Sequence, residues 1–207
     1  MTGLAQPLTP KQTEIVDAAL RVIGRLGIAD LTTSTLAAEL GVSAGAPFRH
    51  FASRDEILEA VALRVEEVIQ TTFPDSAGPP LEGIRSLFLG RTGAVGRHTG
   101  IARLMFSEQF SLALPKAAAK RMRNLVEKTR SFLLKSLHAA ATTGEIRSDV
   151  TPEALLPIVL GTLQSLVFAR SLKAVKETQV MATCDTLFTL LRNSCPLEPR
   201  PVSKDIS

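Results

Sequence analysis

Two glycines and a proline fall within the seven residues Gly41–Pro47, between stretches that have clear helical patterns. A glycine costs a helix about 1 kcal/mol, and an interior proline costs about 3 kcal/mol. The chain therefore has to leave a helix at Gly41 and turn tightly before the next helix begins. This interruption limits the possible folds more than any other feature of the sequence.

Signals for helix starts flank the interruption. Thr9–Gln12 is a capping box with proline at the first helical position, and Gly27 ends the helix that follows. The pair Thr32-Thr33 begins a short second helix. Ser53–Glu56 is a further capping box, which predicts a helix that runs to about Phe73.

The residues around Gly41 have the pattern of a helix-turn-helix motif. Ala37 stands four residues before Gly41, and apolar residues lie beside both. Gly41 supplies the left-handed conformation of the turn, and the small Ala37 lets the next helix cross closely. We expect Ser43 to cap a short third helix, with Gly45 in its first turn. Pro47 then lies at the end of that turn, where its missing N–H costs least.

Beyond a break at residues 74–80, the chain contains only helical patterns. They cover residues 81–97, 100–112, 116–143, 152–172 and 174–194, and no run alternates as a strand would. We therefore predict an all-α fold of about nine helices. The tail at residues 196–207 is rich in proline and polar residues, which predicts disorder.

Composition and motifs narrow the functional class. No apolar leader is visible, and the longest apolar run, residues 154–169, is short for a membrane span, so we expect a cytoplasmic protein without a membrane partner. Three histidines and two cysteines are too few and too scattered for a metal site, and we expect no metal and no cofactor. No catalytic signature occurs, so we expect no enzyme. The residues concerned are His50, His98, His138, Cys184 and Cys195.

Charge is distributed unevenly along the chain, whose formal net charge is +4. Residues 1–70 contain six Lys and Arg against nine Asp and Glu, whereas residues 71–207 contain 18 against 11. A helix-turn-helix is a DNA-binding motif, and with so few cations the N-terminal segment can make few contacts with DNA phosphates. We expect modest affinity per DNA half-site, which makes dimerisation important.

From Ile15 to Val61 the sequence resembles the tetracycline-repressor (TetR) family of bacterial transcription regulators. The resemblance rests on AALRVIGRLGIADLTTSTLAAELGVSAGAPFRHFASRDEIL, and residues 144–166 resemble the family's more variable effector half. It implies a three-helix helix-turn-helix DNA-binding domain at residues 1–73, with a connecting fourth helix from about residue 54. It also implies a helical ligand-binding and dimerisation domain at residues 74–195. The function implied is a ligand-responsive homodimeric repressor that binds a palindromic operator in double-stranded DNA.

The resemblance assigns DNA contacts to individual residues. It implies phosphate contacts from the start of the second helix and from Arg54, and base contacts from residues 43–47. Phe48 lacks the hydroxyl of the family's tyrosine, and Ala44 replaces a common lysine. Direct readout then depends on Arg49 and on methyl contacts. Core packing of Phe48 and His50 and a solvated Arg49 stay open as alternatives. The predicted DNA-binding residues are Thr32, Thr33, Ser34, Ser43, Ala44, Gly45, Ala46, Pro47, Phe48, Arg49, His50 and Arg54.

For the effector half, the resemblance implies a ligand pocket among the middle helices. Apolar walls with cations at the edge suit an amphipathic anion better than a cationic compound. Core packing and solvated faces are the alternatives for these residues, and a neutral or cationic ligand stays open. The predicted pocket residues are Leu87, Phe88, Arg91, His98, Arg103, Phe106, Phe110, Phe132 and Gln164.

The run at residues 154–169 is apolar on nearly all sides, so it has to be covered on two sides. One side is the core of the domain, and we expect the other to meet a second subunit. Together with the last helix it can complete a four-helix bundle across a twofold axis. The predicted interface residues are Leu163, Leu166, Val167, Leu187 and Leu191.

Two other functions remain compatible with the sequence. One is a DNA-binding regulator of the same fold that has no small ligand and is controlled by a protein partner. The other is an enzyme in which the helix-turn-helix is incidental.

Overall fold

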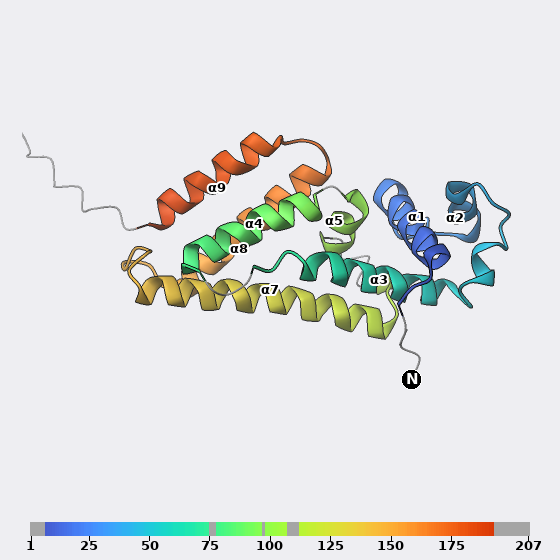
Figure 1. The fold of residues 1–207 in the computed structure, drawn as a ribbon, viewed down its shortest axis with the longest axis horizontal. Helices are drawn as coiled ribbons and strands as arrows, with labels where there is room; N and C mark the ends of the chain where they lie inside the picture. Colours follow the sequence, from blue (N-terminus) through green and yellow to red (C-terminus); the bar gives the residue numbers. More distant parts are fainter. Residues whose placement is uncertain (1–6, 75–77, 97, 107–111, 193–207) are drawn as a thin grey trace, which may run out of the picture.

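The computed structural model describes residues 7–74, 78–96, 98–106 and 112–192. These residues form eight α-helices and one short 3-10 helix, and no strand occurs among them (Figure 1). The all-α prediction is therefore confirmed, and the predicted number of about nine helices is close.

The N-terminal α-helices begin where the capping signals place them, and the last of them ends at Gln70 rather than near Phe73. They are α1 (Pro10–Leu26), α2 (Thr33–Leu40) and α3 (Arg54–Gln70), with the 3-10 helix η1 (Pro47–Arg49) before α3. At the start of α1, the N–H of Gln12 donates to the hydroxyl of Thr9 at 3.3 Å, and the amide oxygen of Gln12 accepts from the N–H of Thr9 at 3.0 Å. Capping bonds of this kind satisfy the orphan N–H groups of a first turn.

The remaining helices follow the predicted runs within a few residues. They are α4 (Pro80–Ala94), α5 (Thr99–Phe106), α7 (Lys116–Thr142), α8 (Pro152–Ser171) and α9 (Glu177–Leu191). The long α7 runs beneath α4 and α8, and α9 lies along the opposite side of the bundle (Figure 1). Residues 107–111 of the run predicted at 100–112 lie outside the described residues, as does the predicted tail.

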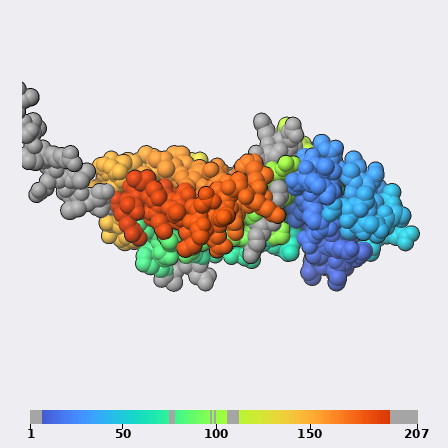
Figure 2. All heavy atoms as spheres, turned by 90° about the horizontal axis from the view of Figure 1, so that it is seen from above, coloured from blue at the N-terminus to red at the C-terminus, as the bar shows by residue number. Residues whose placement is uncertain are grey.

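The three N-terminal helices form one end of an elongated molecule and contact the rest through α1 and α3 (Figures 1 and 2). α5 packs on α1, and α3 packs on α7. A Cβ at Gly100 in α5 would lie 2.1 Å from the carbonyl oxygen of Leu20 in α1. Only glycine permits so close an approach, and it lets α5 pack directly on the N-terminal helix α1.

Candidate DNA-binding and effector sites

The turn after α2 has the geometry that the sequence predicts. Gly41 adopts the left-handed conformation, with φ 67° and ψ 32°. The N–H groups of Gly41 and Val42 donate to the carbonyl oxygens of Ala38 and Ala37 at 3.2 and 3.0 Å. The chain therefore leaves α2 through a tight, fully hydrogen-bonded turn.

The third helix differs from the predicted one. We expected an α-helix capped by Ser43, but the structure has a turn followed by η1, which no side chain caps. The N–H groups of Ala46 and Arg49 bond to carbonyls three residues earlier, at 3.0 and 3.2 Å. An α-helix here would need an N–H from Pro47 to the carbonyl of Ser43, and proline has none.

Most of the predicted DNA-binding residues lie exposed at this end of the molecule. Thr32 caps α2, its hydroxyl accepting from the N–H of Thr35 at 3.2 Å. Pro47 is buried and therefore packs in the core rather than facing base edges, and Phe48 is half-buried against the same core. Ala46 is half-buried as well. The exposed ones are Thr32, Thr33, Ser34, Ser43, Ala44, Gly45, Arg49 and His50.

Arg54 has a structural role that the sequence did not reveal. Its Nε donates to the carbonyl of Leu31 at 2.9 Å, and its Nη2 donates to the carbonyl of Ile28 at 3.0 Å. The guanidinium thus ties the start of α3 to the loop between α1 and α2. We expected a phosphate ligand at this position, but these two donors bind the chain's own backbone.

Arg54→Ala is therefore expected to destabilise the chain by about 1–3 kcal/mol, because two carbonyls lose their donors. Urea denaturation followed by circular dichroism measures this loss. Arg123→Ala is the control, since Arg123 is exposed on α7. An Arg54→Ala variant that unfolds like the wild type but binds every DNA sequence more weakly would restore the phosphate assignment.

Arg49 differs from the other cations of the N-terminal end. Within residues 7–74 it is the only Lys or Arg whose side chain forms neither an ion pair nor a hydrogen bond with the described residues, and it is exposed. A free, exposed guanidinium is available to a ligand. The ion pairs of the others are Lys11–Glu14, Arg21–Glu39, Arg25–Glu39, Arg64–Asp17 and Arg64–Glu67, and Arg54 binds the carbonyls described above.

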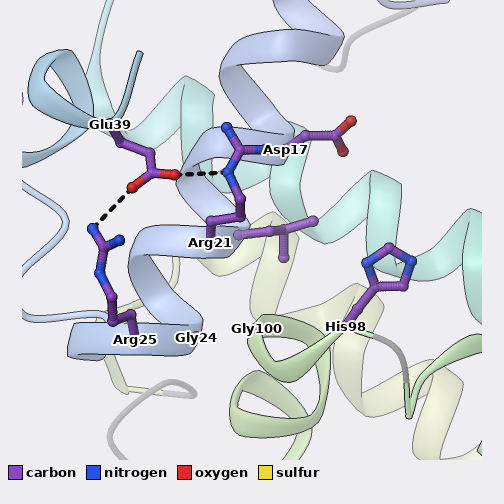
Figure 3. Close-up of a pocket in the computed structure, with 8 residues that line it drawn as sticks. Asp17, Arg21, Gly24, Arg25, Glu39, His98 and Gly100 are labelled. Atoms are coloured by element: carbon purple, nitrogen blue, oxygen red, sulfur yellow. Dashed lines mark hydrogen bonds and ion pairs between the residues drawn. The ribbon is translucent and has the colours of Figure 1, made fainter. Parts of the chain in front are cut away.

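Glu39 holds α2 against α1. Arg21 and Arg25 approach its two carboxylate oxygens at 2.7 and 2.8 Å (Figure 3). The hydrogen bond from Arg21 lowers the pKa of Glu39, and the second arginine adds to the effect. These two ion pairs keep the orientation of α2 on α1, and this orientation sets where the turn at residues 41–46 lies.

A cleft of about 640 Å³ lies beside the two ion pairs of Glu39, between α1, the end of α2 and the start of α5 (Figure 3). His98 lines this cleft, and Arg103 reaches the carbonyl of Arg25 at 3.4 Å. Both were predicted to line the effector pocket. The structure instead places them at the junction with α1, because α5 packs along α1.

A second cavity lies among α4, α5, α7 and α8. Of the predicted pocket residues, Arg91 and Gln164 line it. Leu87 and Phe88 are fully buried core residues, and Phe132 packs edge-on against Phe73 at 5.8 Å. The side chain of Phe106 and all of Phe110 lie outside the described residues. The sequence did not reveal Met105, Val126, Thr129 and Leu160 as lining residues, because helical spacing alone does not separate cavity from core.

The five predicted interface residues do not face outward. Leu163, Leu166 and Val167 of α8 and Leu187 and Leu191 of α9 are each less than 8% exposed in the single chain. They form part of its own core, and Leu163 and Val167 also line the second cavity.

A different stripe of α8 is exposed, and it carries no charge. Among the described helices, α8 is long and apolar enough to cross a membrane, judged by length and composition only. Of its most apolar 18-residue stretch, 33% is buried inside the structure. One row of its exposed positions recurs at helical spacing and contains no charged residue, and α9 also has exposed apolar residues. The row consists of Ala154, Ile158, Gly161, Ser165 and Phe168 on α8, with Leu172 directly after the helix, and the exposed apolar residues of α9 are Met181 and Leu190. Glu153, Pro157 and Gln164 of α8 are also exposed but lie outside this row.

This arrangement defines a structural class: a helix-turn-helix with a larger helical half behind it. Residues 15–61 match the family model described as bacterial regulatory proteins, tetR family. The N-terminal end is therefore similar to the N-terminal domain of that family, and the chain has the fold of TetR-family transcriptional regulators. A comparison with curated proteins gives no match.

Solved structures agree with this fold along nearly the whole chain. The ketosteroid transcriptional regulator KstR2 of Mycobacterium tuberculosis is 16% identical with a TM-score of 0.78, covering 93% of this chain and 100% of that one. AibR, in complex with isovaleryl coenzyme A and operator DNA, is 15% identical with a TM-score of 0.70, covering 88% and 98%. The fatty acid degradation regulator FadR from Bacillus halodurans is 18% identical with a TM-score of 0.62, covering 92% and 99%.

Proposed function

We propose that this chain is a homodimeric repressor that releases its operator when a small molecule binds the effector half. The observation that carries the DNA-binding part is Arg49. It is exposed beside the helix-turn-helix turn and is left unpaired by the described residues, whereas its neighbouring cations are paired. A guanidinium in this position suits bidentate contact with a guanine edge in the major groove.

Dimerisation follows from the weakness of a single half-site. With one free cation on the DNA-binding end, each subunit makes few phosphate contacts, and two linked half-sites compensate. The uncharged stripe of α8 and the apolar residues of α9 supply a surface for the second copy. Ile158 and Leu190 are 55% and 63% exposed, and Ile158 belongs to a continuous uncharged row, which favours contact with another chain more than a single exposed apolar residue does.

The effector part of the proposal rests on the cavity and on its connection to α1. Met105 of α5 lines the cavity, and Gly100 of the same helix touches the backbone of α1. A ligand that moves α5 would therefore move α1. Through the ion pairs of Glu39 with Arg21 and Arg25, it would also move α2. The two recognition segments of a dimer have to lie about 34–36 Å apart on DNA, so a shift of a few Å is enough to release the operator. AibR, a structural neighbour, is seen with both an acyl thioester and operator DNA.

DNA binding is tested by fluorescence anisotropy with the region upstream of the chain's own gene and, in parallel, by selection from random DNA. We expect a palindromic site bound by two copies of the chain. If selection from random DNA yields no preferred sequence, the proposal is refuted. Operator binding that no small molecule releases would favour the alternative, a regulator of the same fold controlled by a protein partner.

A further inference from the structure

Arg91 of α4 is a buried cation that lacks a counter-charge. Its side chain is only 3% exposed, and no described carboxylate pairs with it. Its Nε donates to the hydroxyl of Thr72 at 2.7 Å, and its Nη1 reaches the hydroxyl of Thr129 at the long distance of 3.5 Å. Its Nη2 has no hydrogen-bond partner among the described residues. A buried polar atom left in this state needs an explanation.

The surroundings compensate this charge only in part. Burial lowers the pKa of Arg91 to about 10, so the guanidinium remains charged at neutral pH. Its central carbon lies 5.2 Å from the centroid of the Phe73 ring, and the bond to Thr72 places it at the C-terminal end of α3. A ring face and a helix end each attract a cation. Neither supplies an acceptor for Nη2.

The cavity beside Arg91 is the place from which a partner could come. Its described walls are mostly apolar and contain no Asp or Glu, and its polar members besides Arg91 are Thr129 and Gln164. The free space is about 40 Å³, which holds one carboxylate group, and the exposed residues Val126 and Gln164 border it, so the apolar part of a small acid has to lie toward the surface. The apolar lining residues are Met105, Val126, Leu160, Leu163 and Val167.

We propose that this cavity binds the carboxylate of a small apolar acid, with Arg91 as the anion-binding residue. The inference rests on the proposed effector function and names its ligand class. A carboxylate is planar, neutralises one charge and accepts a hydrogen bond from Nη2. A neutral ligand would leave the charge unpaired, and a cation would be repelled. A single guanidinium, without a second cation among the described lining residues, matches a monoanion better than a phosphate dianion.

Binding at Arg91 would act directly on the helix that leads to the DNA-binding end. Thr72, which accepts from Arg91, donates in turn to the carbonyl of Ile69 in the last turn of α3 at 2.7 Å. A Cβ at Gly90 would lie 3.4 Å from the carbonyl oxygen of Thr72, so α4 already packs tightly there. A carboxylate that draws Arg91 toward the cavity therefore loosens its hold on the end of α3.

The first test uses the wild-type chain and matched pairs of compounds at constant ionic strength. Calorimetry compares butyrate and benzoate with butyramide and benzamide, and adds butylammonium and methyl phosphate. We expect at least one acid to bind at least about tenfold more tightly than its amide, as charged hydrogen bonds in a buried site predict. Equal binding of acid and amide, tighter binding of butylammonium or methyl phosphate, or no binding by either acid would overturn the proposal.

The second test removes the charge. Arg91→Gln is expected to fold with an unchanged or raised melting temperature, because a buried unpaired charge is lost, and to bind the acid at least about tenfold more weakly. Binding of the amide should not change. Arg85→Gln on the same helix is the matched control, since Arg85 pairs with Asp185 away from the cavity. Wild-type affinity of Arg91→Gln for the acid would contradict the assignment.

Two further readouts keep the outcomes separable. If Arg91→Gln does not fold, Thr129→Val leaves the charge in place and removes the neighbouring hydroxyl, and we expect a severalfold loss for the acid alone. Operator binding without any acid is measured in parallel. Intact operator binding with failed acid binding refutes only the carboxylate inference. Acid binding by a chain that binds no operator refutes the proposed function and leaves this site standing.

Discussion

Arg49→Ala is expected to weaken binding of the specific operator by about 1–3 kcal/mol per half-site and to relax the preference for one base pair in each half. The reason is that Arg49 is the free cation beside the turn, whereas the other cations of residues 7–74 are occupied within the protein. Anisotropy titrations with the consensus site and with single-base variants measure both effects.

Arg123→Ala is the control, because Arg123 is exposed on α7, away from the helix-turn-helix. The salt dependence adds a second measure. Each phosphate contact contributes a slope of about −0.9 to the logarithmic plot, so the few contacts available predict a shallow one. An Arg49→Ala variant with the wild-type consensus and affinity would show that another group reads the DNA.

Ile158→Glu and Leu190→Glu are expected to convert the dimer into folded monomers, with a dimer dissociation constant raised at least about a thousandfold. Each places a charge in both halves of the proposed twofold interface, where an unpaired buried charge costs several kcal/mol. Light scattering measures the mass, and circular dichroism checks the fold. Loss of operator binding should accompany loss of the dimer.

Two control variants distinguish loss of the dimer from loss of the fold. Leu26→Glu changes a residue that is 46% exposed on α1, and we expect it to stay dimeric. Leu163→Glu should unfold the chain rather than dissociate it, because Leu163 lies in the core of one subunit. A folded dimer for both Ile158→Glu and Leu190→Glu would place the interface elsewhere.

Helix boundaries could be predicted because their causes are local. Thr9 and Ser53 satisfy N–H groups three residues away, and Gly41 needs only its own freedom to adopt a positive φ. The helix-turn-helix followed from these signals together with the small Ala37. The third helix was the local exception: Pro47 was expected to be tolerated near a helix start, but the segment forms a 3-10 helix, and Pro47 has no N–H for the α-helical bond to Ser43.

The sequence by itself determined the helical class, nearly every helix and the location of the DNA-binding turn, since each depends on residues within about four positions of one another. Only the tertiary structure decided which side of α8 is core and which is exposed, because an all-apolar helix has no periodic contrast to orient it. It also decided that Arg54 clamps a loop, that Arg49 stays free and that Arg91 is buried without a counter-charge. The surroundings of those three arginines come from segments far apart in the chain, and no local pattern encodes them.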